Sequence, residues 1–241
     1  MLFNSFQFLF FFIIVYSLYL VLNHKTQNRM LLIASYIFYG LWDWRFLFLI
    51  FFTTCVDYFC ALNIEESRVA HRRKFFLAVS IVTNLSILCF FKYFNFFLEN
   101  LIALLNTFGV HPNISTLNIL LPVGISFYTF QSISYTVDVY RKEMKATKNF
   151  LDFVLFVAFF PQLVAGPIER AKTLIPQILT PRVLTKDKFW EGCHLIAWGL
   201  FEKMFVADNL ALLVDPRDRY LDRRGHRDSG GDPYAHTALW R

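Results

Sequence analysis

Charged residues are scarce in this chain. Asp, Glu, Lys and Arg together make up 17% of its 241 residues, whereas hydrophobic residues make up 56%. A soluble domain of this length would carry far more charge on its surface. The hydrophobic residues also occur in long runs instead of amphipathic stripes, which indicates that lipid surrounds most of the chain. We therefore expect an all-α, polytopic membrane protein with several transmembrane helices.

Several chemical signatures are also missing. Four cysteines are present without a CxxC or Cys/His spacing, so neither a disulfide framework nor a metal site is expected. No P-loop, GxGxxG, HExxH or Ser-His-Asp set occurs. The net charge of +6 comes without a basic stripe interleaved with aromatic residues, which argues against nucleic-acid binding. The N-terminus lacks a basic region and a small-residue cleavage site, and predicts a retained first span instead of a signal peptide.

Apolar runs predict where the chain enters the membrane. They cover residues 6–22, 31–64, 75–91, 117–140, 150–165 and 189–214. The second run is too long for one crossing, and "LWDWR" (Leu41–Arg45) predicts an interfacial turn that divides it. After Lys92, apolar residues continue at helical spacing to Phe108. One continuous helix would be longer than the bilayer core, so we expect this second part to lie in the interface.

Basic segments predict which ends of these spans share one side of the membrane. Such segments lie at 23–30, 65–74, 141–149 and after 166. The first three are separated by pairs of crossings if the loop at 109–116 is external. Only the run 150–165 lies between the third and the fourth, so a single crossing there would place one basic segment on the wrong side. We therefore predict that 150–165 forms a re-entrant segment.

The stretch "FFPQLVAGPIER" (Phe159–Arg170) ends this run. It breaks the helical pattern with Pro161, Gln162, Gly166 and Pro167, and closes on Glu169 and Arg170. A backbone that turns inside a membrane must be buried in protein or face a wet cavity, so we expect these six residues to line a substrate path. An ordinary helix end is the alternative interpretation.

The run 117–140 carries a second set of candidates. Tyr128, Gln131, Tyr135 and Asp138 are spaced 3, 4 and 3 residues apart, which places them on one helix face. Thr129, Ser132 and Thr136 line the neighbouring face. Such a face should point to the helix bundle or to a water-filled path; the alternative is that these groups only hold helices together.

Two single residues are weighed separately. Asp57 lies inside the third predicted span and needs a partner, for which Lys or Tyr from another helix is expected. His194 lies in the apolar run "EGCHLIAWGL", where a lone histidine is expected to be an interior residue and not a catalytic base. From the residues alone, the chain is either a membrane transporter or a membrane-embedded transferase.

Three motifs resemble one family. They are "LPVGISFYTFQSISYTVDVYR" (121–141), "FFPQLVAGPIER" (159–170) and "WGLFEKMFVADNLA" (198–211), and "SYIFYGLWDWRFLFLI" (35–50) agrees with them. Together they resemble the membrane-bound O-acyltransferases, in particular the bacterial alginate O-acetyltransferase branch, over residues 1–214. The resemblance implies a ring of helices around a funnel through the bacterial inner membrane.

The resemblance also implies the chemistry. An acyl donor, acetyl-CoA or another activated acyl group, would act as co-substrate on the cytoplasmic side, with no bound cofactor. The acceptor would be a hydroxyl of an exported polysaccharide such as alginate, made nucleophilic by a histidine base. Membrane lipid and periplasmic or membrane partner proteins for acetyl transfer are the implied partners.

Two features depart from the family. Its catalytic histidine belongs to a later transmembrane region that this chain does not contain, so no catalytic residue is assigned and the chain is expected to be an inactive fragment. The composition also changes after residue 214: residues 215–241 contain six Arg and no Lys, while residues 1–214 contain ten Lys and eight Arg. We expect this tail to be non-native sequence or disordered.

Two other functions stay open at this point. A transporter or channel would use the polar face of 128–138 as a conduit, and would give substrate flux without acyl transfer. A non-catalytic assembly subunit of a polysaccharide-modification complex would instead depend on partner proteins.

Overall fold

A computed structural model describes residues 5–108, 122–163, 166 and 169–211. These residues form helices joined by short connections, and this part of the chain contains no strand, as expected for an all-α protein. The chain divides into two units, Met1–Arg182 and Val183–Arg241. Pro167 and the atypical tail at 215–241 lie outside the described residues, so the prediction about the tail stays untested.

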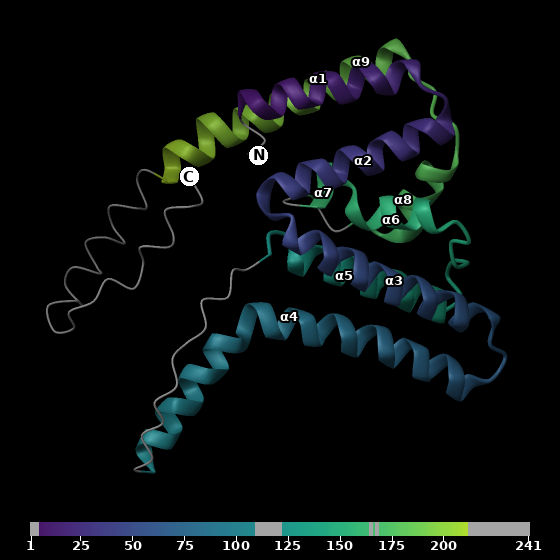
Figure 1. The fold of residues 1–241 in the computed structure, drawn as a ribbon. Coiled ribbons are helices and arrows are strands. Elements are labelled where there is room, and N and C mark those ends of the chain that lie inside the picture. Colours follow the sequence, from purple (N-terminus) through teal and green to yellow (C-terminus); the bar gives the residue numbers. More distant parts are fainter. Residues whose placement is uncertain (1–4, 109–121, 164–165, 167–168, 212–241) are drawn as a thin grey trace, which may run out of the picture. The chain divides into compact units, whose positions relative to one another are not determined.

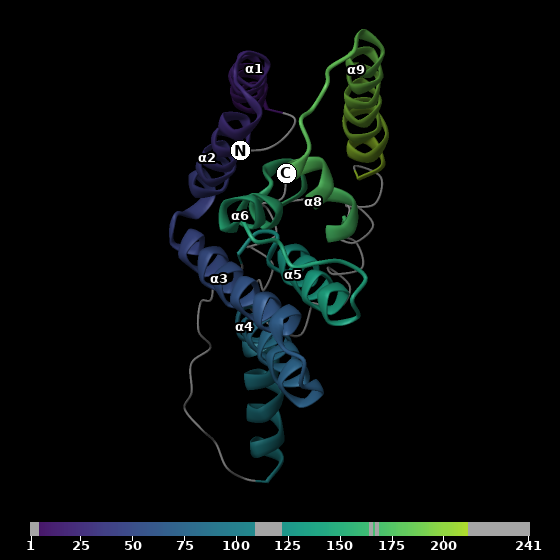
Figure 2. The same cartoon turned by 90° about the vertical axis from the view of Figure 1, so that its right-hand side faces the viewer.

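Eight helices are described in the first unit (Figures 1 and 2). They are α1 (Phe6–Val21), α2 (His24–Asp43), α3 (Arg45–Glu66), α4 (Ala70–Thr107), α5 (Ile125–Tyr140), α6 (Phe150–Ala158), α7 (Phe160–Leu163) and α8 (Ala171–Leu179). Of the described helices, α3 and α4 are long and apolar enough to cross a membrane, and shorter apolar helices lie at Phe6–Val21 and Phe150–Leu163.

The predicted division of the second apolar run is confirmed. α2 ends at Asp43 and α3 begins at Arg45, with Trp44 between them. Asp43 accepts hydrogen bonds from Arg45 Nη2 at 2.7 Å and from Arg45 Nε at 3.0 Å. Trp42 and Trp44 are both exposed, as aromatic residues at a membrane interface would be.

Two of the basic segments, 23–30 and 65–74, are mostly helical and do not form loops between the spans. Residues 24–30 belong to α2, so only Leu22 and Asn23 join it to α1, and Ser67–Val69 alone join α3 to α4. Lys, Arg and Gln are good helix formers, and their long side chains reach water from the end of a helix that is otherwise apolar. Charge therefore did not mark the end of helical structure.

The residues after Lys92 continue the same helix, and their predicted place in the membrane interface stays a prediction. α4 is one helix of 38 residues, about 57 Å at 1.5 Å per residue, against a bilayer core of about 30 Å. Figure 1 shows that it bends partway along its length, so the second part departs from the direction of the first without a break in the helix.

The buried centre of the first unit is α6. Phe153–Ala158 are all buried, at 0–3% exposure, because this short helix is apolar on every side. α6 packs against α2, α3, α5 and α8, while α3, α4 and α5 pack against one another. Residues 153–158, the middle of the predicted run 150–165, are thus surrounded by protein.

The second unit contains α9 (Lys186–Phe201) and the π-helical turn η1 (Glu202–Ala207). The helix changes type at Glu202, and Trp198 Nε1 donates to Glu202 Oε1 at 2.8 Å. Neither element has a buried residue within this unit, and His194 is exposed there. The expectation that His194 is an interior residue stays a prediction.

Candidate functional site

The polar face of α5 lies inside the first unit. Tyr128, Gln131, Tyr135 and Asp138 are 0%, 5%, 0% and 8% exposed. The neighbouring Thr129, Ser132 and Thr136 are buried too, so most of this helix is covered by other elements. Gly124 precedes the helix with φ of 75°, a left-handed conformation that favours glycine. Pro122 and Gly124 both lie before the first turn of α5, which begins at Ile125.

Gln131 supports the break that follows α6. In a continuous helix, the N–H of Phe160 would donate to the carbonyl of Phe156. Here Gln131 Nε2 donates to Phe156 O at 2.9 Å, and Phe160 N donates to Ser35 Oγ at 3.1 Å. Side chains from α5 and α2 thus replace the missing helical bond. This is what an interrupted helix needs where water cannot reach the backbone.

Tyr135 has a similar structural role, whereas Tyr128 and Asp138 keep unused polar atoms. Tyr135 Oη accepts from the backbone N–H of Thr147 at 2.9 Å, which fixes the loop after α5. Tyr128 Oη and Asp138 Oδ2 are buried and have no hydrogen-bond partner among the described residues. Of the four predicted residues on this face, these two are the ones with free capacity toward a substrate.

The close turn after α7 explains why "FFPQLVAGPIER" has a glycine at position 166. Gly166 N donates to Gln162 O at 3.0 Å, and a Cβ at Gly166 would lie 2.5 Å from Gln162 Cα. Pro161 lies in the first turn of α7, where proline is tolerated because its missing N–H has no helical partner. Gln162 Oε1 is buried without a partner in the described part of the chain.

The two charged residues that close the motif precede α8. Glu169 is half-buried, while Arg170 is exposed and caps the helix, its carbonyl accepting from Thr173 N at 2.9 Å. Their predicted place on a substrate path, like that of the other motif residues, stays a prediction.

Asn28 of α2 holds both ends of the segment that runs from α6 to α8. Its Nδ2 donates to Asp152 Oδ1 in the first turn of α6 at 3.1 Å and to Ile178 O near the end of α8 at 3.0 Å. Phe160, the first residue of α7, donates to Ser35, which lies seven residues or about 10 Å further along α2. The segment from α6 to α8 therefore begins beside Asn28, passes Ser35 and ends beside Asn28 again.

A buried polar network was missed from the sequence. Asp57 accepts from Ser80 Oγ at 2.6 Å and from Asn84 Nδ2 at 2.8 Å, and all three are 0% exposed. The expected Lys or Tyr partner is wrong, because α4 supplies neutral donors to the carboxylate. Ser80 Oγ also lies 3.1 Å from Thr136 Oγ1, which joins α3, α4 and α5. The i, i+4 spacing of Ser80 and Asn84 was the available signal.

The basic segments gather at one end of the first unit. Glu65 Oε2 accepts from Ala146 N at 2.6 Å, His24 Nε2 lies 3.2 Å from Leu179 O, and Lys172 pairs with Glu143 at 3.5 Å. These contacts connect the ends of α2 and α3, the loop after α5 and α8, which are the four basic segments of the sequence. We call this the basic end.

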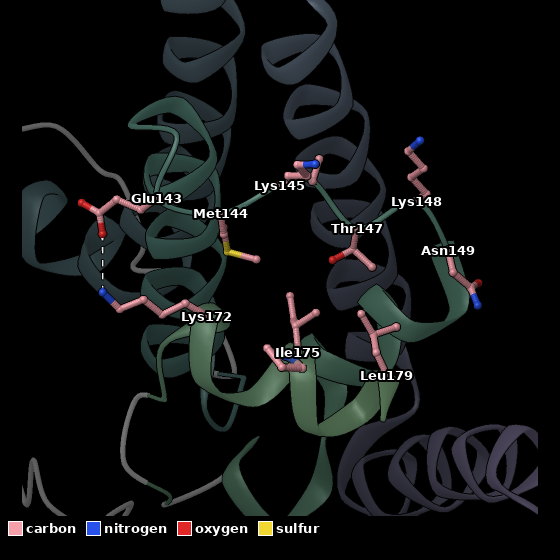
Figure 3. Close-up of a pocket in the computed structure, with 11 residues that line it drawn as sticks. Glu143, Met144, Lys145, Thr147, Lys148, Asn149, Lys172, Ile175 and Leu179 are labelled. Carbon is pink, nitrogen blue, oxygen red and sulfur yellow. Dashed lines mark ion pairs between the residues drawn. The ribbon is translucent and has the colours of Figure 1, made fainter. Parts of the chain in front are cut away.

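A cavity of about 520 Å³ opens at the basic end, between the loop 143–149 and α8. In Figure 3, Met144 and Thr147 point toward Ile175 and Leu179 across this space, so its floor is largely apolar. Lysines 145, 148 and 172 lie around it, and Lys172 forms the ion pair with Glu143. The cavity thus combines an apolar floor with lysines and one glutamate at its rim.

Comparison with known proteins follows the motifs. The chain is 45% identical over 217 residues, 89% of its length, to a protein of Pseudomonas aeruginosa named "Probable alginate O-acetylase AlgI". It is 43% identical to the protein of the same name from Azotobacter vinelandii, and 32% identical to the peptidoglycan O-acetyltransferase of Helicobacter pylori. The resemblance to the alginate-type O-acyltransferases is confirmed.

These alginate-type relatives are longer than the matched segment. The chain spans 41%, 43% and 46% of the lengths of the three proteins. No protein-family model and no solved structure matches the chain. Among the described residues, no group of three or more His, Cys, Asp or Glu side chains is placed to hold a metal ion.

Proposed function

We propose that this chain is part of a membrane-embedded O-acetyltransferase that transfers acetyl groups to hydroxyls of an exported polysaccharide such as alginate. The observation that carries the proposal is the match of 89% of the chain to proteins named for that reaction. α5, which carries most of the motif at 121–141, also buries two polar side chains, Tyr128 and Asp138, that each have a polar atom without a hydrogen-bond partner among the described residues. A substrate that entered the bundle would meet these groups.

We propose that α2, α3, the first part of α4 and α5 cross a bacterial inner membrane, with the basic end in the cytoplasm. The positive charge of that end supports this orientation. Large apolar side chains on the outer face of α3 support the crossing: Phe48, Phe52 and Phe59 are 68%, 54% and 61% exposed. Exposing such an apolar face to water is unfavourable, whereas lipid can cover it.

The same orientation makes α6–α8 a re-entrant segment. It starts and ends beside Asn28 at the basic end and turns about 10 Å deeper, beside Ser35. A helix of nine residues is about 14 Å long, which is too short to cross a core of about 30 Å. The segment is therefore placed to form part of the wall of a path that opens to the cytoplasm.

The acyl donor, acetyl-CoA or another activated acyl group, would approach the basic end as a co-substrate. Lysines attract such an anion, and Asp138, in the last turn of α5, lies at this end. The acceptor polysaccharide and any periplasmic or membrane partner for acetyl transfer would act from the opposite side. The general base is not assigned to any residue of this chain.

A chimera tests the proposal. The matched segment of the Pseudomonas aeruginosa relative is replaced by residues of this chain, and the product is expressed in a strain that lacks its own acetylase. We expect acetyl groups to return to the exported polysaccharide. A chimera that inserts in the membrane and yields unacetylated polysaccharide would contradict the proposal; substrate flux without acetylation would favour a transporter.

Asp138→Asn and Tyr128→Phe in the same chimera test the path. Both changes keep the size of the side chain, and neither removes a side-chain hydrogen bond to another described residue. We expect acetylation to fall while membrane insertion stays normal, and a fully acetylated polysaccharide would remove these residues from the path.

A further inference from the structure

A second cavity, of about 310 Å³, lies among α1, α2, the break around Phe159 and α8. Its walls are mainly aromatic: Phe12 and Tyr16 come from α1, and Phe159, Phe160 and the ring of Pro161 come from the break. Polar groups collect at one end, where Tyr19, Gln177 and Arg182 line it. The cavity is thus apolar over most of its surface and has a single cation.

Arg182 is held in place at that end. Its Nε donates to Gln177 O at 3.2 Å, and its guanidinium carbon lies 5.8 Å from the centroid of the Tyr19 ring. Its Nη1 is buried and has no hydrogen-bond partner in the described part of the chain. A buried guanidinium N–H without an acceptor is unfavourable, and the planar guanidinium matches the oxygens of a phosphate group.

The cavity also has a direction relative to the membrane. Tyr19 lies next to the turn between α1 and α2, where Gln27 Nε2 donates to its carbonyl at 2.8 Å, so Arg182 lies near the basic end. Phe12 is seven residues earlier in α1, which places it about 10 Å deeper. The charged end therefore lies at the membrane surface and the aromatic end lies toward the middle.

We propose that this cavity binds one phospholipid of the cytoplasmic leaflet. Its phosphate accepts hydrogen bonds from Arg182, and one acyl chain lies between the aromatic residues of α1 and the break. The charge, the apolar walls and the order of the two along the membrane normal match the parts of a phospholipid. The site rests on the proposed membrane orientation, and it does not depend on acetyl transfer.

A comparison of three ligands with the unaltered 241-residue chain tests the proposal. The chain is purified in detergent, and binding is measured by native mass spectrometry. Phosphatidylglycerol is the probe; diacylglycerol with the same chains lacks the phosphate, and glycerophosphoglycerol lacks the chains. We expect phosphatidylglycerol to bind more tightly than either. Equal binding of diacylglycerol, or equal binding of glycerophosphoglycerol, would overturn the proposal.

Two variants locate the site. Arg182→Gln should weaken phosphatidylglycerol binding about tenfold, because it removes the charge-assisted hydrogen bonds to the phosphate. Lys148→Gln is the matched control, since it removes a positive charge from the basic end outside this cavity and should leave binding unchanged. Equal binding by the two variants would place the lipid elsewhere and overturn the assignment. Loss of acetylation in the chimera would leave this result unaffected.

Discussion

At the scale of single residues, Gly166 and Asn84 are both required in the interior of the first unit, for different physical reasons. The backbone of Gln162 occupies the position that a Cβ at Gly166 would need. Asn84 is required as a hydrogen-bond donor, since its amide donates to both oxygens of Asp57, at 2.8 and 3.0 Å. One position needs the absence of a side chain and the other needs a donor.

Gly166→Ala should destabilise the first unit. The added methyl group would lie 2.5 Å from a backbone carbon, so the turn must shift, at a cost of about 1–3 kcal/mol. The apparent Tm in detergent, followed by tryptophan fluorescence, measures the change. Gly192→Ala is the control, because a Cβ there meets nothing within 4 Å and alanine favours helix. Equal Tm values for the two variants would show that the turn at Gly166 is loose.

Asn84→Ala should cost about 1–3 kcal/mol, since it leaves a buried carboxylate short of donors. Asn100→Ala is the control on the same helix: Asn100 is exposed and makes only a local bond to Phe96 O at 2.7 Å. Combining Asn84→Ala with Asp57→Asn should cost less than the sum of the two single changes, because they act on one interaction. An additive result in thermal unfolding would contradict the network.

At the scale of elements, the interruption between α6 and α7 depends on side chains from two other helices. Ser35 accepts from Phe160 N and donates to Leu31 O at 2.7 Å, and Gln131 donates to Phe156 O. Because both polar groups of the missing helical bond are buried, the interruption is stable only while these partners are present.

Ser35→Ala should therefore reduce the protection of one backbone amide against hydrogen exchange. The N–H of Phe160 loses its acceptor, and we expect its hydrogen exchange to become faster than in the unaltered chain. Ser17→Ala on the exposed face of α1 is the control and should leave that amide unchanged. If exchange at Phe160 is the same in both variants, another group must satisfy the N–H.

The sequence predicted elements better than their ends and partners. Apolar runs located α1, α3, α4 and α6, and the "LWDWR" turn was placed correctly, because hydrophobic length and aromatic anchors are local properties. The ends of α2 and α4 were missed because basic residues extend helices as readily as apolar ones.

The candidate site was predictable only in part, for a related reason. The buried face of α5 followed from the spacing of its polar residues. The partners of Asp57 and Phe160 could not be predicted from the sequence. Ser80 is 23 residues from Asp57 and Ser35 is 125 residues from Phe160, and only tertiary packing brings each pair together.

At the scale of the whole first unit, the two ends differ in charge and should face different compartments. Lys148 lies at the basic end, and Trp44 lies at the opposite end of α3, a helix about 33 Å long. With the native cysteines replaced by alanine, Lys148→Cys should react with an impermeant maleimide in inside-out vesicles only. Trp44→Cys should react in right-side-out vesicles only. Labelling of both positions from the same side would contradict the proposed orientation.

Asn28 and Ser35 have a consequence for how the protein is made. The contacts that hold the α6–α8 segment come from a helix that precedes it by 124 and 125 residues. Synthesis runs from the N-terminus, so α2 leaves the ribosome well before that segment exists, and in the proposed orientation it is then already in the membrane. The segment, too short to insert as a crossing of its own, thus emerges when its docking surface is already in place. Assembly of this interrupted helix follows the order of translation.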